Sequence, residues 1–313
     1  MTQPTTDGAP PAEPEPARAV VVLLATRNGC RWIDEQIDSI YAQVGVDVAV
    51  VASDDGSTDD TRERLRAWSG KRPLHVLDDA AGRLGSANRN FLRLIRDAPI
   101  GDATHVALAD QDDIWSDDKC LRACETLDDH RADVYSSDVI AFWPDGRQVY
   151  IRKSHGLRGH DHLFESAGPG CTFVFRRETF ERLRAWVLLN FTALQDVKVH
   201  DWLIYAYART QGWRWIIDAR ATVLYRQHGA NELGANSGLR PGLTRVRNVL
   251  TGRYRHDVLC VAAAVGDRSW VTPALARLDL RDRLRLAASS GELRRRRRDQ
   301  LLMALFLLTM RRT

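Results

Sequence analysis

The sequence predicts an α/β fold in which helices cover both faces of a central sheet. Short apolar runs rich in β-branched residues alternate along the chain with segments whose apolar residues recur at helical spacing. Such alternation is typical of strand–helix–strand units, which build parallel sheets. Polar or acidic clusters follow three of the expected strands, and ligands of these sheets bind at the carboxyl ends of the strands. The fold class therefore also predicts where a functional site should lie.

The expected elements follow one another from residue 19 onward. We expect strands at 19–25, 46–53, 74–77, 105–109, 134–142, 148–152, 171–175, 213–217 and 221–225. Helices are expected at 31–43, through Leu65 and Trp68, at 85–97, at 178–189 and in the aromatic segment that His200 and Asp201 open. The first helix carries Trp32 among its apolar residues at helical spacing. Ser57 or Thr58 should cap the second helix, because hydroxyl side chains are favoured at N-caps.

The charge distribution indicates an acidic body with a basic tail. The chain has 313 residues, 44% of them hydrophobic, which suffices for one large domain and an appended element. Residues 236–313 contain 17 arginines, no lysine and 6 acidic residues, a balance of +11, so the net charge of +4 leaves −7 on residues 1–235. A nucleic-acid enzyme with a basic cleft would show the opposite distribution, so we expect no nucleic-acid partner.

Three regions are expected along the chain. Residues 1–18 are rich in proline, alanine and threonine and lack the features of a signal peptide, so they should form a disordered leader. Residues 19–235 should form the catalytic domain, and residues 236–313 a basic, mostly helical C-terminal region. Five scattered cysteines without a C-x-x-C pair indicate neither a disulfide framework nor a cysteine zinc site, which favours the cytoplasm.

The end of the C-terminal region combines charge with an apolar segment. Five arginines at 294–298 precede the apolar segment 301–310, which has about half the length that a bilayer span needs. The segment is a peripheral anchor at the inner face of the cell membrane, a helix that binds a partner such as a second copy, or a helix packed on the body. All three interpretations stay open at this point, and so does a homo-oligomer.

Asp110-Gln111-Asp112-Asp113 is the strongest local signal for chemistry. Three carboxylates within four residues directly after a buried strand repel one another unless a cation lies between them. Oxygen ligands suit Mg²⁺ or Mn²⁺, either of which can bridge protein carboxylates and a substrate phosphate. The alternative is an acidic turn in which one aspartate caps the next helix.

Six blocks in this order carry a family resemblance: LLATRNG, SDDGSTDD, LADQDDIWSDDK, GPGCTFVFRR, HDWLIYAYA and YRQHGANELG. Over residues 19–235 the chain resembles the inverting family-2 glycosyltransferases with the GT-A fold, and among them the bacterial rhamnosyltransferase-type branch. The resemblance implies a Rossmann-like mixed sheet with helices on both faces and a divalent metal. It also implies transfer of a sugar, L-rhamnose in this branch, from a dTDP or UDP donor to a hydroxyl of a glycan or lipid-linked acceptor.

The resemblance assigns a group of residues to the donor nucleoside. Thr26 and Asn28 would lie beside it, Asp54 would accept a hydrogen bond from the pyrimidine edge, and Asp55 would support that loop. The alternative for the two aspartates is an Asx turn that caps a helix. Asn88 could face the donor or lie on a helix surface.

The resemblance also assigns the diphosphate and the metal. Asp112 and Asp113 match the metal-binding part of the family's D-x-D motif, and Asp110 would lie nearer the ribose. His228 would complete the metal shell, unless it is a structural loop histidine. Arg226 would contact the diphosphate, because its guanidinium suits phosphate oxygens.

Asp201 matches the general base of the family. It would take the proton from the acceptor hydroxyl as that oxygen attacks the anomeric carbon from the face opposite the diphosphate, so configuration would invert. The alternative is an ordinary N-cap of the following helix. His200 stands where glutamate is commoner, and it is assigned to the acceptor together with Trp115 and Trp202, whose aromatic faces suit sugars unless they belong to the core.

Two other classes of protein remain to be weighed. A dinucleotide-dependent oxidoreductase is excluded, because the turn after the first strand, Ala25-Thr26-Arg27-Asn28-Gly29, lacks the G-x-G-x-x-G pattern. A module that binds a nucleotide-sugar without transferring it is the alternative function.

Overall fold

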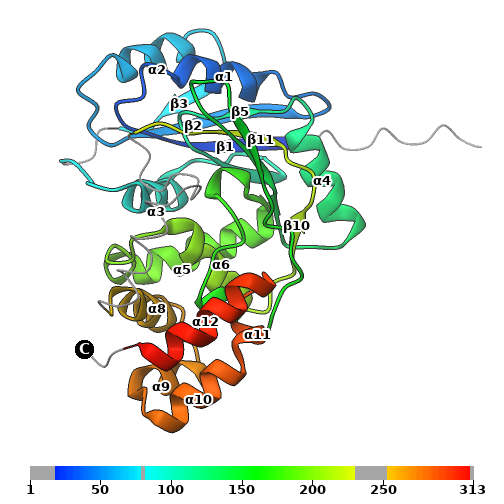
Figure 1. Ribbon diagram of the computed structural model, residues 1–313. Helices are drawn as coiled ribbons and strands as arrows, with labels where there is room; N and C mark the ends of the chain where they lie inside the picture. Colours follow the sequence, from blue (N-terminus) through cyan, green and yellow to red (C-terminus); the bar gives the residue numbers. More distant parts are fainter. Residues whose placement is uncertain (1–17, 79–81, 230–251, 311–313) are drawn as a thin grey trace, which may run out of the picture.

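The structure is a computed structural model of the chain, and it describes residues 18–78, 82–229 and 252–310. Figure 1 shows an upper body of sheet and helices and a lower group of C-terminal helices. The expected leader, apart from Arg18, and the expected domain boundary at residue 235 lie outside the described residues.

A seven-stranded sheet with the order β10-β6-β9-β4-β1-β2-β3 forms the centre of the body. Its strands are β1 (Ala19–Thr26), β2 (Asp47–Asp54), β3 (Leu74–Val76), β4 (His105–Ala109), β6 (Val134–Ser137), β9 (Val174–Arg176) and β10 (Trp215–Asp218). All neighbours are parallel except that β9 runs antiparallel between β4 and β6. The sheet is therefore mixed, as the resemblance implies, whereas the strand–helix alternation alone predicts a parallel one.

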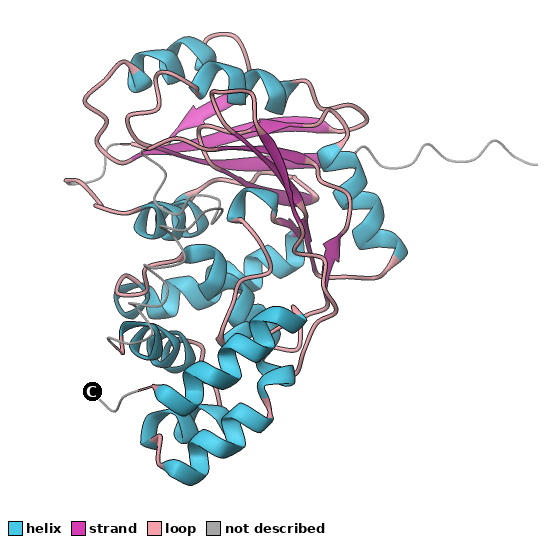
Figure 2. Ribbon diagram, in the orientation of Figure 1, coloured by secondary structure: helices cyan, strands magenta, loops and turns pink. Residues whose placement is uncertain are grey.

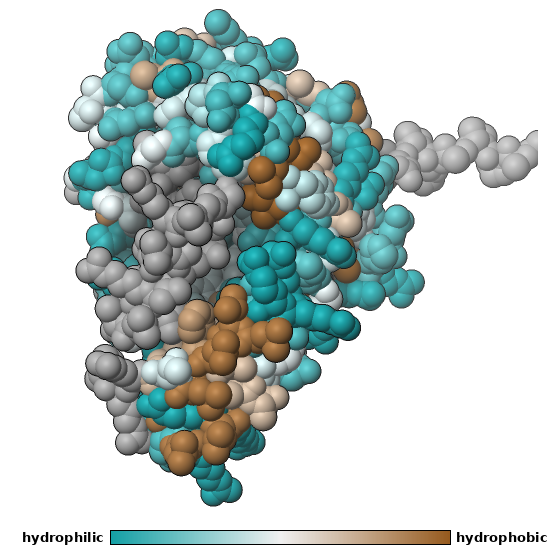
Figure 3. Space-filling model, in the orientation of Figure 1, coloured by the Kyte–Doolittle hydropathy of each residue, from teal (hydrophilic) through white to brown (hydrophobic). Residues whose placement is uncertain are grey.

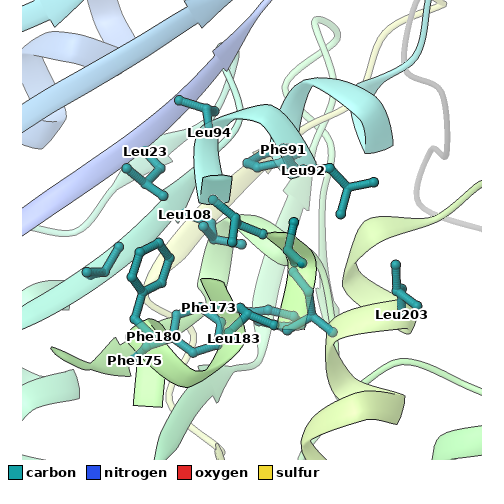
Figure 4. Packing of buried hydrophobic residues seen from close by; sticks show 14 of the residues in the cluster. Leu23, Phe91, Leu92, Leu94, Leu108, Phe173, Phe175, Phe180, Leu183 and Leu203 are labelled. Carbon is teal, nitrogen blue, oxygen red and sulfur yellow. The ribbon is translucent and has the colours of Figure 1, made fainter. Parts of the chain in front are cut away.

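Helices cover both faces of this sheet (Figures 1 and 2). One face carries α1 (Ile33–Tyr41), α2 (Thr61–Ser69) and α4 (Lys119–Asp129), and the other carries α3 (Ala87–Asp97), α5 (Arg177–Leu194) and α6 (His200–Thr210). Leu23 of β1 packs with Phe91 and Phe175 on the face covered by α3, α5 and α6 (Figure 4). Its neighbours Val22 and Leu24 pack on the opposite face, under α1, α2 and α4. Because successive side chains of a strand point to opposite faces, a strand buried on both sides is apolar throughout.

A second sheet of four strands, with the order β5-β11-β7-β8, lies beside the first. Its strands are β5 (Ile114–Trp115), β7 (Val139–Phe142), β8 (Gln148–Ile151) and β11 (Val223–Arg226). β11 pairs with β5 through Val223 and Leu224, which places the residues after β11 against the acidic turn after β4. This pairing positions much of the site described below.

Several local predictions need correction. The expected strand 134–142 is two strands in different sheets, divided at the buried Asp138, which accepts hydrogen bonds from the Ser154 amide (2.8 Å) and hydroxyl (2.8 Å). The expected strand 171–175 begins as a 3₁₀ turn, η2 (Gly170–Thr172), and only then becomes β9. Neither Ser57 nor Thr58 caps α2, which begins after Asp60; both bind the loops around Asp54 and Asn28 instead.

The C-terminal region is helical, with α8 (Arg253–Ala264), α9 (Val271–Arg277), α10 (Leu280–Ala288), α11 (Ser290–Leu293) and α12 (Arg297–Thr309). These helices build their own apolar cluster around Leu163 and Phe164, at and just after η1 (Asp161–Leu163) of the body. Arg295 is buried at the junction, with Asp161 at 3.5 Å and Glu165 at 3.6 Å. One side of α12 therefore packs into this cluster, against α10 and α11, and the cluster joins the body through Leu163 and Phe164. Among the described helices, none is both long enough and apolar enough to cross a bilayer.

Candidate active site

A cavity of about 380 Å³ opens at the carboxyl ends of β1, β2 and β4, beside the first turn of α6. Eight of the residues that the sequence singles out line it, namely Thr26, Asn28, Asp55, Asp110, Asp112, His200, Asp201 and His228. Six others do not line it: Asp54, Asn88, Asp113, Trp115, Trp202 and Arg226. The structure thus gathers residues from five separate sequence blocks into one cavity.

Asp54 is a structural centre of the loop after β2. Its carboxylate accepts hydrogen bonds from Thr26 Oγ1 (3.1 Å), the Ser57 amide (2.8 Å) and Arg62 Nε (2.8 Å). Burial opposes its ionisation, but the hydrogen bonds from Arg62, Ser57 and Thr26 outweigh burial and lower the pKa of Asp54. A carboxylate so engaged and withdrawn from the cavity is poorly placed to contact a nucleobase.

Asp55 and Asn28 line the cavity and hold its walls. Asp55 accepts hydrogen bonds from the backbone amides of Gly85, at 2.9 Å, and Leu84. Asn28 has a positive φ of 47°, a conformation that asparagine tolerates better than most residues, and its Oδ1 accepts from the Thr58 amide at 2.8 Å. Asn28 therefore ties the loop after β1 to the loop after β2, and Asp55 ties the loop after β2 to the segment before α3.

Gln111 is a site residue that the sequence does not single out. Its Nε2 donates to the Arg27 carbonyl (2.8 Å), and its Oε1 accepts from the Arg27 amide (2.7 Å), so one side chain joins the loops after β4 and β1. A Cβ atom on Gly29 would lie 2.2 Å from Gln111 Oε1, so this close approach requires glycine. Gln111 could have been suspected only from its place between aspartates.

Asp112, in the acidic turn after β4, contacts His228 at the cavity. His228 Nε2 lies 2.6 Å from Asp112 Oδ2, and the imidazole stacks on the Trp32 ring with centroids 4.0 Å apart. Trp32 lines the cavity and is not part of α1, which begins one residue later. The prediction that Trp32 belongs to the apolar face of this helix is therefore wrong.

Asp113 lies behind Asp112 and is fully buried. Its Oδ1 accepts from the Arg226 amide (3.1 Å), whereas its Oδ2 is buried with no hydrogen-bond partner among the described residues. Burial, helped by the negative charge of Asp112, raises the pKa of Asp113 to about 8. A cation at this turn would relieve both the unsatisfied oxygen and the repulsion.

Cys171 is a second residue that sequence reasoning missed. Ligand atoms of Asp110, Asp113 and Cys171 all lie within 4.8 Å of one another. Burial, followed by the charge of Asp113, raises the pKa of Cys171 well above its ordinary value, so the sulfur is a thiol, which is a poor ligand for hard cations. The carboxylates of this turn, together with His228, are the better candidates for holding a divalent metal.

The side chains of Arg226 and Asn88 contact other residues of the protein and do not face the cavity. Arg226 Nε donates to the Asp112 carbonyl (2.7 Å), and its guanidinium pairs with Glu35 and lies 4.5 Å from the Phe142 ring centroid. Asn88 is buried, and its Nδ2 donates to the Leu194 carbonyl (3.3 Å). Neither residue lines the cavity, so the expected donor contacts are not supported by the geometry.

Asp201 lies in the first turn of α6, whose N-cap is Val199, so the capping alternative is wrong. Its Oδ1 is buried and has no hydrogen-bond partner among the described residues. Burial raises the pKa of Asp201 to about 6, against the opposing effects of the Trp202 amide and the charge of Lys153. Asp201 is therefore a carboxylate that faces the cavity and binds a proton more tightly than an ordinary aspartate does.

His200 stands beside this carboxylate as a neutral side chain. Its ring stacks on Phe91 with centroids 4.0 Å apart, and its Nε2 is buried without a hydrogen-bond partner in the described parts of the chain. Burial lowers the pKa of His200 to about 3. A Cβ atom on Gly170 would lie 2.3 Å from that nitrogen, so glycine makes room for the imidazole.

The two tryptophans assigned to an acceptor belong to the packing of the protein. Trp115 is buried under the Lys119 ammonium, which lies 3.6 Å from its ring centroid. Trp202 donates from Nε1 to the His162 carbonyl (2.9 Å) and packs toward the C-terminal helices near Tyr254. Among the described tryptophan, tyrosine and phenylalanine residues, Trp32 and Tyr225 line the cavity.

Comparison with known proteins identifies the family of the chain. The profile of "Glycosyl transferase family 2" matches residues 21–196. Over 287 residues, 91% of this chain and 99% of the relative, the chain is 38% identical to the dTDP-rhamnosyl transferase RfbG of Shigella flexneri. The structure of S. aureus TarS 1–349 with UDP superposes with a TM-score of 0.55 at 16% identity, covering 91% of this chain and 78% of TarS. For the UDP-GlcNAc complex of TarS the TM-score is 0.54 at 16% identity, with 93% and 81% covered. The chain therefore belongs to glycosyl transferase family 2, has the GT-A fold and is a nucleotide-sugar glycosyltransferase.

Proposed function

We propose that this enzyme transfers L-rhamnose from dTDP-L-rhamnose to a hydroxyl group of a glycan or lipid-linked acceptor, with inversion at the anomeric carbon. The donor is supported by the 38% identity to a dTDP-rhamnosyl transferase that the chain covers almost completely. The observation that carries the chemistry is the carboxylate oxygen of Asp201 that has no hydrogen-bond partner within the described parts of the chain, in the same cavity as Asp110, Asp112 and His228.

Asp201 is proposed as the general base. A carboxylate with a pKa raised to about 6 is still mostly ionised at neutral pH and is a stronger base than an ordinary aspartate. It takes the proton of the acceptor hydroxyl while the oxygen attacks the anomeric carbon and the bond to the diphosphate breaks on the opposite side. His200 stays neutral, so its Nε2 can orient a sugar hydroxyl without adding charge beside the base.

Mg²⁺ or Mn²⁺ is proposed to bind at Asp112 and His228, with Asp110 and Asp113 of the same acidic turn as further candidate ligands. The four side chains offer the oxygen and imidazole ligands that such ions accept, and His228 Nε2 already lies 2.6 Å from Asp112 Oδ2. When bound, the ion would neutralise the negative charge that develops on the leaving diphosphate.

Nucleobase recognition is proposed to fall to Asp55 and not to Asp54. Asp55 lines the cavity, and each of its oxygens holds one backbone amide and keeps a further lone pair for the imino N–H of thymine. Asp54 has no comparable access and instead fixes Thr26 and Ser57 in place.

The test uses the full chain with dTDP-L-rhamnose, UDP-glucose and GDP-mannose, each with Mn²⁺ and with EDTA. We expect dTDP to be released from dTDP-L-rhamnose, whether or not an acceptor is present. This release should depend on the metal and should be lost in Asp201→Asn. Turnover of only UDP-glucose or GDP-mannose would overturn the donor assignment. Tight donor binding without any release of nucleotide would instead indicate a binding module.

A further inference from the structure

The C-terminal helices present a set of leucines to solvent. On α12 the side chains of Leu301 (71% exposed) and Leu305 (60%) project outward with Leu302 and Leu308, and on the adjacent α10 those of Leu280 (71%) and Leu284 do so. We call these six residues the leucine face. Figure 3 shows hydrophobic residues gathered where Figure 1 draws α12 and α10. Isolated exposed leucines are ordinary, but a gathered set marks an interaction site.

The leucine face is not needed to hold α12 in place. The other side of α12 buries Met303, Leu307 and Met310 in the cluster around Phe164. Leu301, Leu305 and Leu308 follow the helical spacing of a second, separate stripe. The helix thus has one apolar side for the protein and one for something else.

Positive charge surrounds this second stripe. Of the five consecutive arginines at 294–298, Arg294 and Arg295 are drawn into the junction with the body, where both contact Glu165. Arg296, Arg297 and Arg298 are exposed at the start of α12, and Arg281 and Arg285 are exposed on α10. The run of arginines therefore divides into a buried part that anchors the region and an exposed part beside the leucine face.

We propose that the leucine face docks on the surface of an anionic phospholipid bilayer. The leucines would enter the boundary between head groups and acyl chains, and the exposed arginines would pair with lipid phosphates. α12 has 13 residues, hence a length of about 20 Å, which suits a helix lying along the surface. A second copy of the chain fits less well, because a symmetric contact would bring the same arginines together. The proposal does not depend on the identity of the donor sugar.

The experiment is flotation of the full chain with vesicles of pure phosphatidylcholine or of phosphatidylcholine and phosphatidylglycerol at 7:3. We expect binding to the anionic vesicles that falls with added salt and is weak on the neutral ones. Leu301→Ser/Leu305→Ser/Leu308→Ser should lower the partition coefficient at least tenfold, and Arg297→Glu/Arg298→Glu should do so independently. Leu188→Ser/Leu189→Ser, which changes two exposed leucines of α5 in the catalytic body, is the matched control and should bind as the wild type does.

Three results would overturn the proposal. The first is no binding to anionic vesicles by the wild type, and the second is equal binding by the wild type and both variants. The third is self-association in sedimentation equilibrium that the triple leucine variant abolishes, with no binding to vesicles, which would assign the leucine face to a second copy. Because all the substituted side chains are solvent-exposed, thermal unfolding and dTDP release should match the wild type in every variant, which separates a failed docking surface from a failed enzyme.

Discussion

His228 Nε2 lies 2.6 Å from Asp112 Oδ2, although 116 positions separate the two residues. The antiparallel pairing of β5 with β11 brings them together. Ile114, two residues after Asp112, is the register partner of Leu224, four residues before His228. Trp32 stacks on the imidazole and limits its rotation. A late histidine thereby joins an acidic turn at a cavity, an arrangement that the acidic motif alone does not contain.

The first prediction concerns this pair. Asp112→Asn should reduce metal-dependent transfer by at least a hundredfold, because it removes a carboxylate proposed to hold the ion. The fold should survive, since removing one of two adjacent carboxylates relieves repulsion in the metal-free protein. Initial rates over a Mn²⁺ titration, together with thermal unfolding, measure both effects. Asp102→Asn, at an exposed loop aspartate, is the control, and an Asp112→Asn enzyme with wild-type rates would exclude Asp112 as a ligand.

The second prediction concerns the base. Asp201→Asn should bind dTDP-L-rhamnose normally but transfer the sugar more slowly by a factor on the order of 10²–10⁴, the usual worth of a general base. For the wild type, kcat/KM should rise with pH through about pH 6, because Asp201 acts only when ionised. Asp196→Asn, at an exposed aspartate nearby, should keep both rate and profile. Weakened donor binding with unchanged chemistry would make Asp201 a structural residue.

The third prediction concerns stability. The folded pKa of Asp201, about 6, lies above the ordinary value of aspartate in an unfolded chain, so the folded state binds the proton more tightly. This carboxyl therefore lowers the free energy of unfolding as pH rises from about 4 to about 6, after which its effect is constant. Asp201→Asn should be more stable than the wild type at pH 7 by an amount on the order of 1–2 kcal/mol, and by less at pH 4.

Urea unfolding of both proteins at several pH values measures this difference, in which the contributions of other titrating groups cancel. A difference that does not change between pH 4 and pH 7 would mean that the carboxyl is solvated in the folded protein.

The positions of the strands that build the site follow from the sequence, because strands buried on both faces are apolar throughout and their ends are marked by polar residues. What the sequence left open depends on local geometry. Asp54 and Asp55 are adjacent and chemically identical, yet only the turn after β2 decides that Asp55 faces the cavity. Trp32 precedes the helix whose periodicity it shares, so its stacking on His228 has no sequence signal.

Other features depend on tertiary pairing. Cys171 reaches Asp113 because a 3₁₀ turn places it beneath the acidic turn, and nothing in the order of the motifs indicates that contact. The strand expected at 134–142 divides because Asp138 gathers amide and hydroxyl donors from residues 150–154, a partnership that a propensity argument cannot contain. Trp115 and Trp202 illustrate the opposite case, in which an aromatic residue near a motif belongs to the core.

The last prediction tests the room that Gly170 leaves for His200. In Gly170→Ala the new Cβ would lie 2.3 Å from His200 Nε2, so the imidazole would have to shift from its place on the Phe91 ring. Overpacking of this kind costs about 1–3 kcal/mol of stability. Because His200 adjoins the proposed base, the rate of transfer should also fall. Gly156→Ala, where nothing lies within 4 Å of the added atom, is the control.

A double-mutant cycle identifies the imidazole as the cause. In the His200→Ala background the new Cβ has space, so Gly170→Ala should cost little further stability, and the coupling between the two substitutions should be about as large as the single penalty. Transfer should stay low in the double variant, because the side chain proposed to orient a sugar hydroxyl is gone. An equal penalty for Gly170→Ala in both backgrounds would place the strain in the backbone of η2 and leave His200 without a role in it.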